Sequence, residues 1–244
     1  MKNFINKDIK KVIKDSLRLN EALSAQQKQF NINTDFLTSA NVDNHIDLYE
    51  GYIDNFNKSN LKLDSIDKDN VNSSHSDFRS LKLDETYNLN GVYLHELYFA
   101  NIGDNASQIQ MDSLSYMRLS RDFGSFDNWQ KDFLACCKGS QNGWAITYLN
   151  TYTQTYMNAM VDMHTNNIPF GSYPVIVMDV WQHAYYRDYL KDVGTYSKAM
   201  MKQLKWGIIE ERINKADKFI QVLRGQLWKA YINCYLNKKK AIKR

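Results

Sequence analysis

Apolar residues in the first part of the chain recur at steps of three and four positions, the spacing of an amphipathic helix. This pattern predicts a helix from Lys7 to about Gln29. A second helix is predicted after Leu37, where Thr38 or Ser39 can cap the first turn. The chain therefore opens with helical segments.

Residues 57–90 are polar and rich in Asn, Ser and Asp. Helical patches within them are interrupted at Asn72–Ser76, whose composition is typical of an exposed turn. The segment Asn90–Asn101 again has a helical pattern, and the Gly and Asn residues of Gly103–Ser107 end it. These segments predict a helical hairpin that occupies the first half of the chain.

In the second half of the chain, segments with the apolar spacing of strands alternate with segments that have the apolar spacing of helices. Short β-branched or alternating runs predict strands, whereas the three- and four-residue spacing predicts helices. The predicted helices are Asp112–Arg121, Phe126–Cys137, Thr195 to about Leu223 and Gly225–Leu236, and the predicted strands are Gly143–Leu149, Thr153–Val161 and Val175–Met178.

Together these elements predict an α+β fold, in which a helical hairpin is followed by a domain with a three-stranded antiparallel sheet and helices. We expect four parts: an N-terminal helical extension (1–30), the hairpin domain (31–108), the α+β domain (109–217), and a C-terminal helical extension with a basic tail (218–244).

The composition is that of a globular protein, with 43% hydrophobic and 24% charged residues among 244. The net charge of +4 does not indicate nucleic-acid binding, because five positive charges lie in the last seven residues. They are Lys238, Lys239, Lys240, Lys243 and Arg244. The rest of the chain is close to neutral, so the partner that we expect is not a nucleic acid.

Three cysteines do not make a disulfide framework and suit a reducing compartment. The first residues lack the apolar core of a signal peptide, and no apolar run approaches the roughly 20 residues that cross a bilayer. We therefore expect a cytoplasmic protein, or one carried in a viral particle, that is neither secreted nor bound to a membrane.

The most informative stretch follows the third predicted strand. Asp179 lies at the end of that strand, and His183 comes four positions later, one helical turn away. A carboxylate and an imidazole at this spacing can point at one transition-metal ion. A helix cap or a surface ion pair would fit the same spacing.

The full string, Asp-Val-Trp-Gln-His-Ala-Tyr from Asp179, resembles the Asp-x-Trp-Glu-His-Ala-Tyr signature of the iron/manganese superoxide dismutases. Gln182 replaces the glutamate of that signature. The resemblance covers residues 30–217 and implies that Asp179 and His183 are two of four metal ligands.

The other two ligands that the resemblance implies are His45 and His95. The family's first ligand histidine follows a helix-start hydroxyl residue by seven positions, and counting from Thr38 leads to His45. Anchoring on Tyr52 instead would place Asn44 there, and we prefer His45 because an amide is a poor ligand for a redox metal. Without the resemblance, His95 would be interpreted as a packed core histidine.

Three further site residues follow from the resemblance. Tyr52 would control access and relay protons, and Trp144 would form one wall of the metal pocket. His164 would reach the solvent at the metal, a task that in many relatives falls to a glutamine. In other relatives that glutamine lies four residues before the second ligand histidine, and this position is Gly91 here. Gly91 has no side chain to reach the solvent, so the resemblance implies that His164 takes this role.

The resemblance implies one Fe or Mn ion per chain and an enzyme that converts superoxide, its small-molecule substrate, to dioxygen and hydrogen peroxide. It also implies a homodimer, in which the residue at the position of Gln182 pairs with a ligand histidine of the other subunit. The neutral Gln182 predicts an altered or absent dimer and reduced activity. The alternative is a structural component of a larger assembly such as a virion, docked through the terminal helices.

Overall fold

The structure is a computed structural model that describes residues 24–103, 107–222 and 225. Most of the predicted helix from Lys7, and the predicted helix Gly225–Leu236 apart from its first residue, lie outside these residues. Residues 24–29 are described and are not helical, so the prediction that the first helix reaches Gln29 is wrong.

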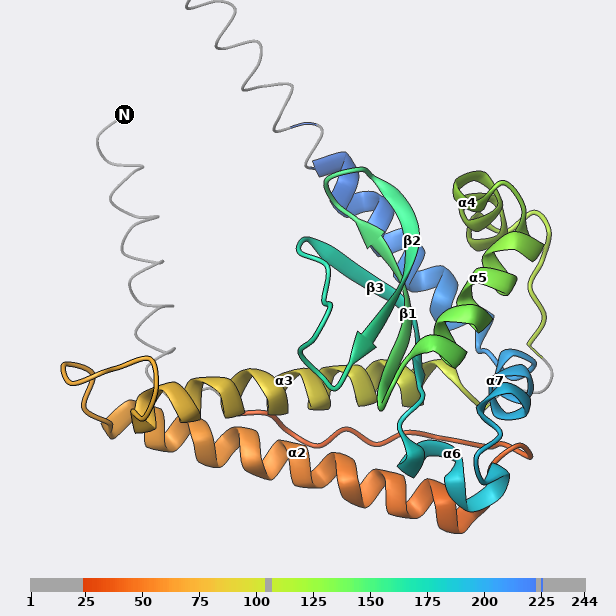
Figure 1. The fold of residues 1–244 in the computed structure, drawn as a ribbon. Helices are drawn as coiled ribbons and strands as arrows, with labels where there is room; N and C mark the ends of the chain where they lie inside the picture. Colours follow the sequence, from red (N-terminus) through yellow and green to blue (C-terminus); the bar gives the residue numbers. More distant parts are fainter. Residues whose placement is uncertain (1–23, 104–106, 223–224, 226–244) are drawn as a thin grey trace, which may run out of the picture. The chain divides into compact units, whose positions relative to one another are not determined.

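The chain divides into two compact units, and the first contains the described part of Met1–Gln29 together with Asp43–Glu96. It contains most of α2 (Ser39–Ser65) and most of α3 (Asp77–Asn101) (Figure 1). The His45 ring lies 5.0 Å from that of His95, and the Tyr52 ring lies 6.2 Å from that of Tyr87. Early residues of α2 therefore face late residues of α3, so the helices are antiparallel and the predicted hairpin is confirmed.

The second unit contains Phe30–Val42 and the described part of Leu97–Arg244. Its helices and its three-stranded antiparallel sheet confirm the predicted α+β class (Figure 1). Its elements are α4 (Leu114–Phe123), α5 (Phe126–Gly139), β1 (Gly143–Asn150), β2 (Thr155–Asp162), β3 (Ser172–Asp179), α6 (Gln182–Tyr189), α7 (Val193–Met201) and a further helix over 206–222.

The sheet has the strand order β2-β1-β3, so β1 is central. α5 packs on one face, where the Trp129 indole donates to the Thr147 hydroxyl at 2.9 Å. Further along, Cys137 Sγ lies 3.3 Å from Met178 Sδ. All four side chains are fully buried, so the core of this unit lies between α5 and the sheet.

The start of α4 is held by two sets of side-chain acceptors. Its N-cap residue Ser113 accepts from the Tyr116 N–H. Glu210, from the helix over 206–222, accepts from the N–H groups of Leu114 and Ser115 at 2.9 and 2.8 Å. A carboxylate at a helix N-terminus also interacts favourably with the helix dipole, so Glu210 joins the two helices.

The single helix predicted from Thr195 to about Leu223 is wrong, because the chain leaves the helix after Met201 and resumes it at residue 206. Between these points Leu204 forms an antiparallel bridge with Ile102, and the Lys205 N–H donates to the carbonyl of Asn101 at 3.0 Å. Backbone pairing with a distant segment therefore replaces one turn of helix.

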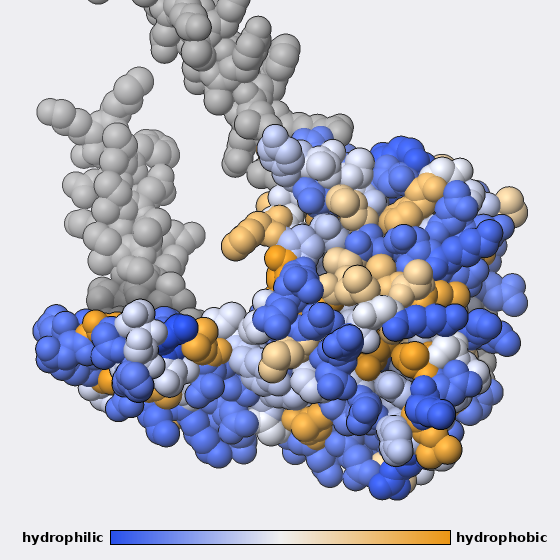
Figure 2. All heavy atoms as spheres, in the orientation of Figure 1, coloured by the Kyte–Doolittle hydropathy of each residue, from blue (hydrophilic) through white to orange (hydrophobic). Residues whose placement is uncertain are grey.

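On the face shown in Figure 2, hydrophobic side chains form separate groups within a mainly hydrophilic surface. Over all the residues that the structure describes, the most exposed large hydrophobic side chains are those of Tyr152 and Phe170, with relative exposures of 93% and 100%. Within the described ranges, no helix combines the length and the apolar character that a membrane span requires.

Candidate metal centre

His45 and His95 are buried in the first unit, at 2% and 0% exposure. Their rings meet edge to face. His95 Nδ1 lies 2.6 Å from the carbonyl of Gly91, one turn earlier in α3, and must donate to it. The lone pair of His95 is therefore on Nε2, the form that a metal ligand requires. Asn44, the alternative to His45, is exposed.

Tyr52 lies against His95, with 5.2 Å between the ring centroids. The tyrosine ring also covers Gly91, where an added Cβ would come within 2.9 Å of two ring carbons. A side chain at position 91 would thus collide with Tyr52 where the ring now lies. The packing of Tyr52 therefore also explains why position 91 is a glycine.

Asp179 and His183 lie in the second unit, on either side of the turn between β3 and α6. The fully buried Asp179 accepts the Trp181 N–H on Oδ1 at 2.8 Å. Its Oδ2 lies 3.2 Å from Nε2 of His183, whose side chain is 27% exposed. One carboxylate oxygen is thus held by the backbone, and the other faces the imidazole.

The four predicted ligands form one group. Each of His45, His95, Asp179 and His183 offers one ligand atom, and these atoms all lie within 4.8 Å of one another. Three imidazoles and one carboxylate are a donor set that suits iron or manganese. His95 uses Nδ1 for its bond to the Gly91 carbonyl, and Asp179 uses Oδ1 for the Trp181 N–H. His95 can therefore present Nε2 to an ion and Asp179 can present Oδ2, so the residues fit such a metal.

His164 and Trp144 also come together in the second unit. The Trp144 indole donates to His164 Nδ1 at 3.0 Å, so the neutral ring carries its hydrogen on Nε2. Burial lowers the pKa of His164 to about 4, against a smaller opposite effect of Asp179. The His164 ring lies 5.4 Å from that of Trp181, which stacks on His183 at 5.7 Å. Aromatic rings thus connect His164 to a predicted ligand.

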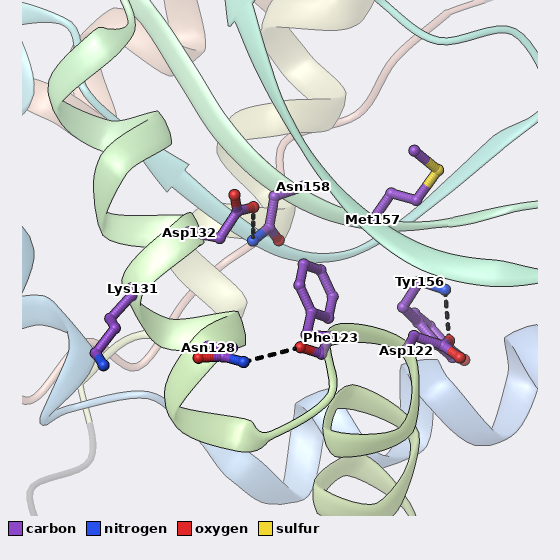
Figure 3. A pocket seen from close by; sticks show the side chains of 8 residues that line it. All are labelled: Asp122, Phe123, Asn128, Lys131, Asp132, Tyr156, Met157 and Asn158. Carbon is purple, nitrogen blue, oxygen red and sulfur yellow. Dashed lines mark hydrogen bonds between the residues drawn. The ribbon is translucent and has the colours of Figure 1, made fainter.

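A separate groove of about 750 Å³ lies in the second unit, between β2 and the helices α4 and α5 (Figure 3). Two pairs of its polar groups bond to each other: Asp122 accepts the Tyr156 N–H at 2.7 Å, and the Asn158 amide donates to Asp132 at 2.8 Å. None of the predicted site residues lines this groove.

Four side chains from three helices hold the outer edge of β3 and bond to that strand or to one another: Tyr98, Asn101, Tyr196 and Arg212. Tyr98 lies three positions after His95, where the family resemblance has an aromatic residue. The other three belong to no motif, so no local signal in the sequence could have identified them.

Comparison with known proteins agrees with this geometry. Residues 113–212 match the family model described as iron/manganese superoxide dismutases, C-terminal domain. The superoxide dismutase [Fe] of Aquifex aeolicus is 30% identical over 196 residues, which cover 79% of this chain and 91% of that protein. The chain belongs to the iron/manganese superoxide dismutase family.

Members of the family named for either metal are similar to this chain. The Aquifex pyrophilus superoxide dismutase [Fe] is also 30% identical over 196 residues. The superoxide dismutase [Mn] 1 of Halobacterium salinarum is 29% identical over 172 residues, covering 69% of this chain and 82% of that protein. Family membership thus supports Fe or Mn as the cofactor without choosing between them.

Proposed function

We propose that the protein is a superoxide dismutase that holds one Fe or Mn ion through His45, His95, Asp179 and His183. The observation that carries the proposal is the close approach of these four ligand atoms in a member of this family. Two superoxide ions and two protons would yield one dioxygen and one hydrogen peroxide. The bound metal would supply the one-electron oxidation and reduction.

The residues around the four ligands would hold and deliver protons and control access to the site. His164 stays neutral at physiological pH because its pKa is about 4, and it holds a hydrogen on Nε2 for donation. Trp144, which is fully buried, fixes this tautomer through its indole N–H. Tyr52, packed against His95, would control access and relay protons.

The test is metal content together with the rate of superoxide consumption on the purified protein. We expect about one Fe or Mn per chain, and activity that disappears in His95→Ala and Asp179→Ala. His75→Ala is the matched control, because His75 is exposed in the loop between α2 and α3 and should leave both measurements unchanged. A protein that binds neither metal would refute the proposal.

The second function is a structural or interaction component with weak or no catalysis. Gln182 favours it, because a neutral amide polarises a neighbouring imidazole less than the family's carboxylate does. Tight metal binding without superoxide consumption in the same assay would support this function and reject the enzyme.

A further inference from the structure

The strand that carries Asp179 lies at an edge of the sheet. β3 pairs with β1 on one side, so along its other side alternate backbone groups point outward. Buried N–H and C=O groups without partners are costly, and edge strands need some form of cover. Residues Val175–Met178 are fully buried, so their outward groups must be satisfied by protein.

Helical side chains satisfy these groups one after another. Arg212 Nη1 donates to the carbonyl of Val175 at 3.1 Å. Asn101 Nδ2 donates to the carbonyl of Val177 at 3.1 Å, and its Oδ1 accepts the N–H of the same residue at 3.0 Å. Arg212 also donates to Asn101 Oδ1 at 3.1 Å, which fixes the orientation of the amide. Asn101 therefore bonds to β3 as a neighbouring strand would.

The third outward carbonyl in this series belongs to Asp179. It accepts the Tyr196 hydroxyl at 2.9 Å. The Tyr98 hydroxyl lies 2.8 Å from that of Tyr196, whose only hydrogen is already used, so Tyr98 is the donor in this pair. Tyr98, Tyr196 and Asp179 are all fully buried, and in such a chain each hydrogen bond strengthens the next.

We propose that Tyr196, supported by Tyr98, is a positioning residue that holds the backbone of Asp179 so that Oδ2 is placed for the metal. The inference rests on the proposed role of Asp179 as a ligand. Asp179 is held at two points: its carboxylate accepts the Trp181 N–H on Oδ1, and its main-chain carbonyl accepts the Tyr196 hydroxyl. Groups that hydrogen-bond to a metal ligand without touching the metal orient that ligand, and they affect metal affinity as well as fold stability.

The test compares tyrosine-to-phenylalanine variants, which remove one hydroxyl and keep the ring. Tyr196→Phe should weaken metal binding about tenfold or more, the usual effect of losing such a support. Tyr98→Phe should weaken it less, because the bond from Tyr196 to Asp179 remains. The double variant should bind metal no more weakly than Tyr196→Phe alone, since the two hydroxyls act in series.

Tyr189→Phe is the matched control. The Tyr189 hydroxyl also donates to a backbone carbonyl, that of Phe36 at 2.6 Å, and its ring lies 5.6 Å from that of Tyr196. This variant should lose stability without losing metal affinity. The measurements are the metal dissociation constant from chelator competition and the free energy of unfolding of the metal-free protein.

Equal metal affinity in Tyr196→Phe and Tyr189→Phe would overturn the inference and leave the proposed function intact. Absence of metal from the unmodified protein would refute the proposed function instead. If Tyr196→Phe does not fold, the comparison of Tyr98→Phe with Tyr189→Phe decides, and equal affinities there would again overturn the inference.

Discussion

At the scale of single residues, His164 makes stability depend on pH. The folded protein holds it neutral down to about pH 4, whereas the ordinary pKa of histidine is 6.5. Between these values the unfolded chain binds more protons, so its contribution destabilises the fold as the pH decreases from 6.5 to 4. The effect on the free energy of unfolding is on the order of 3 kcal/mol, at roughly 1.36 kcal/mol per pKa unit.

We therefore expect His164→Gln to flatten this part of the stability profile of the metal-free protein. The glutamine oxygen can still accept the Trp144 indole N–H, while its amide does not titrate. Urea unfolding at pH 4.5, 5.5 and 7.5 measures the difference. An identical slope in both proteins would show that His164 does not carry the effect.

The sequence identified which residue types gather at the candidate metal centre, but not which atoms they present. The string around Asp179 and His183 and the histidine spacing suggested the ligand set. The tautomer of His95 depends on its distance to the Gly91 carbonyl, and the Trp181 N–H on Oδ1 decides which oxygen of Asp179 faces His183. Such atomic choices follow from backbone geometry, which residue spacing does not specify.

At the scale of elements, Glu210 joins the helix over 206–222 to the start of α4. Glu210→Ala should lower the free energy of unfolding by about 1–2 kcal/mol, because two helix N–H groups lose a charged acceptor. Glu211→Ala is the control, because its side chain is 67% exposed and pairs with Lys215 on the surface of the same helix. Chemical denaturation of both variants measures the difference, and equal losses would contradict the capping role.

The helices and strands were predictable where apolar residues recur at a regular spacing along the sequence. The three strands and the helices α4 and α5 lie within a few residues of their predicted positions. The interruption after Met201 was not predictable, because it depends on Leu204 meeting Ile102 about a hundred residues earlier in the chain. Local helical preference is weak enough for such tertiary pairing to override it.

At the scale of the whole molecule, Gln182 bears on self-association. It is exposed at the first position of α6, next to His183. The family resemblance implies that a glutamate here pairs with a ligand histidine across a two-fold dimer. Gln182→Glu should therefore tighten dimerisation about tenfold or more, because the symmetric contact gains two charge-assisted hydrogen bonds. Gln141→Glu, another exposed position, controls for charge alone.

Analytical ultracentrifugation of these two variants and the unmodified protein tests this expectation. An unchanged dissociation constant in Gln182→Glu would reject it.

The four-part division of the chain at residues 30, 108 and 217 stays a prediction, as does any assembly role of the terminal extensions.

The sulfur pair between α5 and β3 also bears on damage by the proposed reaction's own product. Hydrogen peroxide oxidises cysteine through the thiolate, so a thiol that keeps its proton reacts slowly. Burial raises the pKa of Cys136 to about 11 and that of Cys137 to about 12. The packing that fills this core therefore also keeps the Cys137 thiol in the form that resists peroxide.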